Sequence, residues 1–221
     1  MSLNIRTTLL VVIFALTPVF QLAAVDDTQA RLGKAAAVLN NLTDSLRHGI
    51  KPEQIVKADC VAVIPGFKKG AAAVGVGFGR GFVSCRNGDN WSAPAAVTLE
   101  TASLGVQIGG ETIDIVVLSL DKQLRSKLLS DRFAIGADAS AAWGNGKSVH
   151  ADTDAKLLFF GETKGAFAGF GLDGATLKAD HSSNKALYGK PITNSEVVEG
   201  HADMPTAAQP LIAKLTEETS R

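Results

Sequence analysis

Apolar residues near the start of the chain recur at the spacing of an α-helix. Between Thr28 and Ile50 they lie three or four positions apart and so share one face, at Leu32, Ala35, Leu39, Leu42 and Leu46. Charged and amide side chains occupy the other faces, and the pattern therefore predicts an amphipathic helix. Pro52 suits the first turn of a helix and predicts a second, short one over "PEQIVKAD".

From Cys60 onwards the pattern changes to that of strands. Short runs rich in β-branched and aromatic residues are separated by turn signals such as Asn87-Gly88. The runs that predict strands are "CVAVI", "AAVTLE", "LGVQIG", "TIDIVVLSL", "RFAIGADASAAW", "ADTDAKLLFF" and "GAFAGFGLDGATL". A helix is predicted after Asp121, which can cap it, and helical signals return from about Ser182.

Glycine is concentrated in the strand region. Eighteen of the 22 glycines lie between Gly66 and Gly174, and glycine inside strands is typical of bulges, tight bends or close backbone approach. Many glycines on successive strands favour a strongly coiled sheet or a small barrel. We therefore predict one α+β domain, with a strongly twisted, glycine-rich antiparallel sheet or small barrel flanked by N- and C-terminal helices.

The densest glycine segment, "KKGAAAVGVGFGRGFVSC", raises the question of whether it binds a phosphate or forms a strand. It does not fit the dinucleotide pattern GxGxxG, because Arg80 and Phe82 stand where the third glycine is needed. Glycine instead occupies every second position, which places one face of a strand at Gly75, Gly77, Gly79 and Gly81. Such a flat face favours packing by an aromatic ring, a helix or an acyl chain; direct contact between a ligand and the backbone is the alternative.

Composition and charge narrow the class of protein. The chain is 46% hydrophobic and 20% charged, as in ordinary globular proteins. Lys and Arg number 22, as do Asp and Glu, and this balance argues against a nucleic-acid partner.

The N-terminal residues predict export. The apolar run from Thr8 to Phe20 is followed by small residues at Leu22–Ala24, a pattern that favours a signal peptide over residues 1–24, with an uncleaved anchor as the alternative. Residues 25–221 are then expected to form a single periplasmic or secreted domain.

The two cysteines, Cys60 and Cys85, are expected to form a disulfide, because an even count in an exported chain favours pairing. The closed loop would contain about 25 residues and would stabilise the fold by roughly 3 kcal/mol on the chain-entropy estimate. Two buried free thiols are the alternative.

Candidate catalytic and metal-binding residues form no recognisable pattern. The chain has no G-x-S-x-G motif. The histidines are not spaced as the ligands of a metal site; they are His48, His150, His181 and His201. Asp114 lies inside an apolar strand, where a carboxylate is costly unless it is paired, so a buried salt bridge or an edge position is expected. We expect no enzyme activity, no cofactor and no metal site; an uncharacterised hydrolase is a remote alternative.

Basic residues near turns and on the predicted helix are candidate ligands for a lipid head group: Lys68, Lys69, Arg80, Arg86, Lys122 and Arg125. If some converge, each would contribute about 1 kcal/mol near an anionic surface. The strand face opposite the glycines supplies candidate apolar contacts, at Val76, Phe78 and Phe82. An ordinary solvated surface is the alternative.

Several blocks, in this order, resemble the SYLF domain family: "CVAVIPGFKKGAAAVGVGFGRGFVSCR", "WSAPAAVTL", "GVQIGGETIDIVVL", "FAIGADASAAWG", "GAFAGFGLDGATLKAD" and "ALYG". The resemblance runs from about Leu32 to Gly189, which makes 32–189 the core and 190–221 a helical C-terminal tail. It implies a lipid-binding module, since eukaryotic members bind phosphoinositides and membranes and some bundle actin filaments. This chain is similar to the stand-alone secreted members found in bacteria.

These observations lead to one main functional expectation and one alternative. The main expectation is a non-catalytic, membrane-associated binding module that is exported to the cell envelope and meets an anionic lipid, such as phosphatidylinositol, or a membrane surface. The alternative is a structural or protein-interaction domain of the envelope, whose partner is a protein and whose basic residues only keep the fold soluble.

Overall fold

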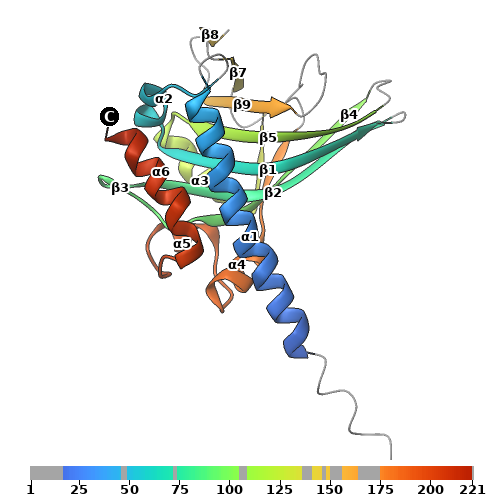
Figure 1. Cartoon of the computed structure of the whole chain (residues 1–221), viewed down its shortest axis with the longest axis vertical. Coiled ribbons are helices and arrows are strands. Elements are labelled where there is room, and N and C mark those ends of the chain that lie inside the picture. The colour runs from blue at the N-terminus through green and yellow to red at the C-terminus, as the bar shows by residue number, and fades with distance from the viewer. Residues whose placement is uncertain are drawn as a thin grey trace, which may run out of the picture.

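The computed structural model describes residues 17–45, 49–71, 74–104, 109–135, 141–145, 148–149, 156–163 and 175–220. In these residues a strongly curled sheet carries helices on both of its faces (Figure 1). The predicted α+β class, with a twisted antiparallel sheet flanked by N- and C-terminal helices, is confirmed.

The described strands lie in the order β6-β10-β4-β2-β1-β5-β9-β7-β8, and β3 pairs with β2 alone. All of these pairs are antiparallel except β7 with β9, which is parallel. The bounds are Cys60–Ala71 (β1), Val74–Asn87 (β2), Asn90–Trp91 (β3), Ala95–Leu104 (β4), Gly109–Ser119 (β5), Arg132–Ala134 (β6), Ala141–Asn145 (β7), Ser148–Val149 (β8), Leu157–Thr163 (β9) and Thr176–Ala179 (β10).

The described helices are α1 (Thr17–Asp44), α2 (Pro52–Lys57), η1 (Lys122–Leu124), α3 (Arg125–Leu128), α4 (His181–Tyr188), α5 (Asn194–Val198), η2 (Thr206–Ala208) and α6 (Gln209–Thr219). Asp121 caps η1, as predicted, by accepting a hydrogen bond from the Gln123 amide. Within the described ranges, none of the helices combines the length and the hydropathy needed to cross a bilayer.

The first helix differs from the prediction at both ends. It begins at Thr17, before the expected Thr28, and ends at Asp44 instead of Ile50. The Ile50 amide donates to the Leu42 carbonyl at 2.7 Å. The two residues are further apart in sequence than the four positions of an α-helical hydrogen bond, so the helix does not continue to Ile50. At Gly49 a Cβ would lie 2.2 Å from the Ser45 carbonyl oxygen, so the chain packs closely against the helix end at a residue without a side chain.

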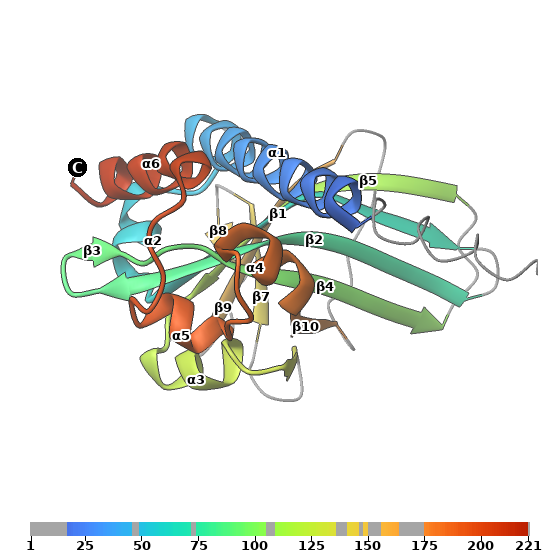
Figure 2. The same cartoon turned by 90° about the horizontal axis from the view of Figure 1, so that it is seen from below.

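The sheet has a separate hydrophobic core on each face. On one face α1, α2 and α6 cover outward-facing strand residues such as Phe82 and Val116. On the other face, inside the curl, strand residues such as Phe67 and Phe159 pack with η1, α3 and α5. Figure 2 shows the two helical layers, and it shows β1, β2, β4 and β5 extending beyond them at one end.

The glycine segment forms a paired strand, so the phosphate-loop alternative is excluded. Strand β2 pairs with β1 on one side and β4 on the other, and this pairing uses its backbone groups. The glycine row faces the inside of the curl, where a Cβ on Gly77 would lie 2.4 Å from the Phe67 ring and one on Gly79 would lie 2.6 Å from Ile64. The aromatic ring that packs on Gly77 and Gly79 is therefore supplied by the chain itself.

The C-terminal residues 190–221, predicted as a tail, are part of the main fold where the structure describes them. Leu211 and Leu215 of α6 lie in the same core as Leu32 and Leu39 of α1. Lys214 of α6 is also close to Asp44 at the end of α1, with the amine and carboxylate 3.4 Å apart. The helix α6 therefore helps to hold α1 on the sheet.

Candidate functional site

The main candidate site is a groove between α1 and the strands β1, β2 and β5. We call it the helix groove; its volume is about 720 Å³. It is lined by Asp27, Arg31, Lys34, Ala37, Val38, Asn41, Pro65, Gly66, Lys68, Phe78, Gly79, Arg80, Thr112 and Asp114. Its size lies within the range of small-ligand pockets, roughly 300–1,000 Å³.

Asp114, the carboxylate inside an apolar strand, lines this groove. Its carboxylate accepts a hydrogen bond of 2.7 Å from the Gly66 amide. Gly66 has a positive φ of 62° and lies in the β-bulge where the register of β1 shifts against both neighbours. Asp114 therefore bonds a backbone amide that the irregular strand leaves outside the ladder, and the expected salt bridge or edge position was wrong.

The polar side of the groove is held by a network that reaches α4. Arg80 of β2 lies 3.5 Å from the buried carboxylate of Asp180. Asp180 also accepts hydrogen bonds from the Ser183 hydroxyl and amide, at 2.8 and 3.0 Å. Arg31 of α1 donates to the same Ser183 hydroxyl at 3.2 Å. Burial raises the pKa of Asp180, but these bonds and the one from Ser182 outweigh it, and the pKa is lowered overall.

The predicted apolar contacts divide into two groups. Val76 and Phe78 of β2 are 58% and 48% exposed. The Arg80 guanidinium lies 6.0 Å from the centre of the Phe78 ring. Phe82, from the same face, is only 1% exposed and packs in the core under α1. It cannot touch a ligand, because the helix covers the strand at that position.

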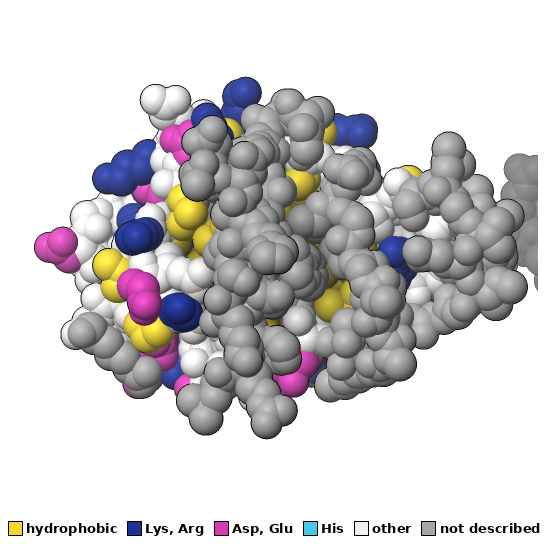
Figure 3. Space-filling model, turned by 90° about the horizontal axis from the view of Figure 1, so that it is seen from above, with side chains coloured by type: hydrophobic (Ala, Val, Ile, Leu, Met, Phe, Trp, Pro, Cys, Tyr) yellow, Lys and Arg dark blue, Asp and Glu magenta, His cyan; other side chains and the backbone are white. Residues whose placement is uncertain are grey.

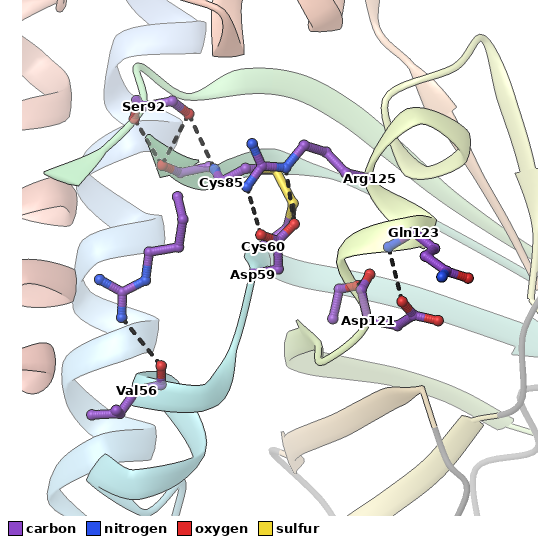
Figure 4. Close-up of polar contacts among 11 residues, drawn as sticks. Val56, Asp59, Cys60, Cys85, Ser92, Asp121, Gln123 and Arg125 are labelled. Carbon is purple, nitrogen blue, oxygen red and sulfur yellow. Dashed lines mark hydrogen bonds and ion pairs between the residues drawn. A yellow bond between two sulfur atoms is a disulfide. The ribbon is translucent and has the colours of Figure 1, made fainter. Parts of the chain in front are cut away.

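A second hollow, of about 890 Å³, lies near the disulfide and contains three other predicted residues, Arg86, Lys122 and Arg125. We call it the disulfide hollow. Cys60 and Cys85 are directly opposed on β1 and β2 and form the predicted disulfide. Arg125 donates two hydrogen bonds to Asp59, the residue before Cys60, and both oxygens of that buried carboxylate are used (Figure 4).

The other two predicted cations of the disulfide hollow, Arg86 and Lys122, are less constrained, and Lys57 of α2 also lines this hollow. The Arg86 guanidinium stacks on Trp91, 4.2 Å from the ring centre. Lys122 is exposed at the start of η1. Arg125 is thus the ion-pair partner of Asp59, and the other cations that line the hollow are Lys57, Arg86 and Lys122.

The six predicted basic residues therefore do not all meet at one site. Lys68 and Arg80 line the helix groove, three others line the disulfide hollow, and Lys69 lines neither. On the face shown in Figure 3, the coloured Lys and Arg side chains are interleaved with Asp and Glu. On this face the described positive side chains are mixed with negative ones, so we consider the helix groove by itself.

Two groove residues, Arg31 and Lys34, were not among the predicted site residues. Their spacing of three on α1 puts them on neighbouring positions of the helix surface. In the sequence they were assigned only to the polar faces of the helix. What the sequence did not reveal is that the irregular strand β1 passes beside that face.

Catalytic and metal chemistry receive no support from the described residues. His181 bonds Asp131 at 2.9 Å on the surface, and no Ser, Thr or Cys in the described ranges hydrogen-bonds to His181 or His201. His48 and His150 lie outside those ranges. The part of the chain that is described holds no group of three or more His, Cys, Asp or Glu placed to bind a metal ion.

Comparison with known proteins gives one family match. A family model described as "Ysc84: Las17-binding protein actin regulator" matches residues 100–218. Protein YSC84 of Saccharomyces cerevisiae is 30% identical over 189 residues, which cover 76% of this chain and 40% of that protein. An SH3 domain-containing protein of Schizosaccharomyces pombe is 30% identical over 201 residues, covering 84% of this chain and 46% of the relative.

A vertebrate relative extends the comparison. The SH3 domain-containing YSC84-like protein 1 of Xenopus laevis is 30% identical over 201 residues, which cover 85% of this chain and 60% of that protein. The chain therefore spans 40–60% of the length of these three relatives. No solved structure matches the chain.

Proposed function

The chain belongs to the Ysc84 (SYLF) family, and on that premise we propose that it is a non-catalytic binding module for anionic lipid membranes in the cell envelope. The family model is named for Las17 binding and actin regulation, and two of the relatives are named for an SH3 domain. These names describe binding and regulation, which supports a module that recognises a partner without transforming it.

The observation that carries the lipid proposal is the exposed apolar pair on β2. Val76 and Phe78 are two of the four large hydrophobic side chains exposed in the described residues. Phe78 is directly opposite Lys68 on β1, and Arg80 follows two positions later on the same face. Apolar side chains beside cations suit the boundary of an anionic bilayer, where the apolar groups enter and the cations meet phosphates.

Export to the envelope is supported by two features. The apolar run from Thr8 to Phe20 has the composition of a signal peptide. A disulfide between Cys60 and Cys85 is typical of an oxidising compartment. Fractionation of the native host, with sequencing of the mature N-terminus, tests this part: a protein that starts at Met1 in the cytoplasm contradicts it.

The membrane proposal is tested by co-sedimentation with vesicles of phosphatidylcholine alone and with added phosphatidylglycerol. We expect binding to the anionic vesicles only. The variant Val76→Ser with Phe78→Ser should bind about tenfold more weakly or worse, because two apolar side chains no longer enter the interface. Absence of wild-type binding to both vesicle types would exclude the proposal.

A matched control is available on a distant surface. Val56 on α2 is 50% exposed and Met204 before η2 is 38% exposed. The variant Val56→Ser with Met204→Ser removes similar apolar surface and should keep wild-type affinity. If it weakens binding as much as the β2 variant, the interaction is unspecific adsorption.

A second candidate is recognition of a protein, which the description of the family model as Las17-binding favours. In that case cross-linking in native envelopes should capture one dominant protein partner and little lipid. The β2 variant would then lose the cross-link without any change in sedimentation with vesicles.

A further inference from the structure

We propose that the helix groove binds a phosphate group carried on a small organic molecule or a lipid head group. The inference deepens the proposed function and rests on it, because it names the site and the chemistry by which an anionic lipid would be recognised. Three features carry it: the balance of charge in the groove, the partners already assigned to those charges, and the shape of the lining.

The charge balance favours an anion. Four cationic side chains and two carboxylates line the groove, and Asp180 pairs with Arg80 from behind it, which leaves a formal excess of one positive charge. Both carboxylates are already engaged: Asp27 pairs with Arg31 four residues later, and Asp114 accepts from the Gly66 amide. A cation would therefore find neither carboxylate free, whereas an anion meets an uncompensated field.

The excess charge comes from two lysines on opposite walls. Lys34 is on α1 and Lys68 is on β1, and both are exposed. Neither makes an ion pair or a side-chain hydrogen bond with another described residue. Each can therefore turn its ammonium group toward a ligand without first breaking a bond within the protein.

Arg80 adds directional donors between the two walls. Only its Nε is paired, at 3.5 Å from Asp180, and its side chain is 44% exposed. No partner within the described ranges is found for its two terminal nitrogens. A guanidinium fork of this kind suits the paired oxygens of a phosphate. The contact with Asp180 restrains this side chain at one point, so less side-chain entropy is lost on binding than for an arginine without a partner.

The shape of the groove indicates what carries the phosphate. At about 720 Å³ it is far larger than a phosphate alone requires. Ala37, Val38 and Phe78 contribute apolar surface to the lining, and Thr112 contributes a hydroxyl. A phosphate ester places its charge at the cations and its organic part along this surface. A free inorganic anion would leave the apolar part uncovered.

The experiment uses two phosphate sources. Glycerol 3-phosphate is the soluble probe, followed by NMR through the amides of Gly66 and Gly79, which line the groove. Phosphatidylcholine vesicles with and without phosphatidic acid are the membrane probe, followed by co-sedimentation. We expect saturable shifts with glycerol 3-phosphate, none with glycerol, and sedimentation only with the phosphatidic-acid vesicles.

The test variant is Lys34→Gln with Lys68→Gln, and both sites are exposed enough to leave folding intact. Affinity for glycerol 3-phosphate should fall about 25-fold, or roughly fivefold for each lysine. The matched control is Lys127→Gln with Lys185→Gln, which removes the same charge from exposed positions on α3 and α4 outside the groove. The control should stay within about twofold of the wild type, since distant charges are screened.

The outcomes separate this inference from the membrane proposal. Unchanged affinity of the Lys34 and Lys68 variant, equal loss in the control, or no wild-type shift at Gly66 and Gly79 would each overturn the groove as a phosphate site. The Lys34 and Lys68 variant could still bind vesicles while the Val76 and Phe78 variant does not. That result would support the membrane function and reject the groove as its phosphate site. Wild-type binding of glycerol 3-phosphate without any vesicle binding would keep the groove and reject the lipid source.

Discussion

Among Gly77, Gly79 and Gly81, the neighbouring backbone approaches Gly81 most closely. A Cβ built there would lie 2.0 Å from the Val63 carbonyl oxygen and 2.8 Å from the Ile64 Cα. Both neighbours are backbone atoms, so rotation of a side chain cannot relieve the contact. We expect Gly81→Ala to lower the free energy of unfolding by about 2–3 kcal/mol, measured by urea denaturation.

The control for this prediction is Gly70→Ala in the neighbouring strand β1. A Cβ at Gly70 would meet nothing within 4 Å. Its effect should stay near zero or be slightly stabilising, because alanine restricts the unfolded chain. Equal destabilisation by the two variants would show that the strands, and not the contact, require glycine.

Tyr188 gives a pH-dependent prediction at the same scale, and it is the one tyrosine of the chain. Its hydroxyl donates to the Pro94 carbonyl at 2.7 Å, and burial raises its pKa well above the ordinary value of about 10. The folded state therefore favours the protonated phenol. The resulting stability is complete below pH about 10 and is lost as the pH rises toward the folded-state pKa.

The measurement is the ultraviolet absorbance of tyrosinate during alkaline titration. Because one tyrosine is present, the signal belongs to Tyr188 alone. Tyrosinate should form late and together with unfolding. The variant Tyr188→Phe should lose about 1 kcal/mol from the missing hydrogen bond and should lose part of the alkaline decline in stability. A normal titration in the folded protein would contradict the buried phenol.

At the scale of elements, the disulfide closes the hairpin of β1 and β2 at the end where α2 and α3 lie. Cys60 and Cys85 are 25 positions apart, so the bond restricts a loop of moderate length in the unfolded chain. We expect Cys60→Ala with Cys85→Ala to cost about 3 kcal/mol of unfolding free energy, measured by chemical denaturation.

Reduction of the wild type supplies the control for this prediction. Reductant should lower the stability of the wild type toward that of the variant and should leave the variant unchanged. A wild type that is equally stable with and without reductant, and equal to the variant, would show that the bond does not constrain the unfolded chain.

Elements with strong local signals were predicted correctly. The Pro52 helix, the Asp121 cap and the turn after Asn87 each depend on residues that are only a few positions apart in the sequence. The end of α1 was missed, because it depends on Gly49 and Ile50 closing back on the helix. The segments around 105–108 and 164–174, parts of the predicted strands, lie outside the described residues.

For the whole molecule, the sequence did not predict how the elements are arranged relative to one another in space. The alternation of glycine predicted a flat face and its packing, yet it could not show that Phe67 from the next strand would fill it. That the six basic residues bind a ligand stays a prediction, and periodicity could not show that five of them divide between the helix groove and the disulfide hollow. Arg31 and Lys34 joined the site only because α1 crosses β1 beside the bulge at Gly66 (Figure 1).

The position of α1 has a practical consequence. One side of this helix is buried in the core with α6, and another side forms a wall of the helix groove. A molecule that bridges Lys34 and Lys68 would link the helix to the sheet. The folded protein would bind it and the unfolded protein would not. Its presence at 100 times its dissociation constant would add about 2.7 kcal/mol. Melting-temperature screens of metabolite and lipid libraries can therefore search for the natural occupant without an assay for activity.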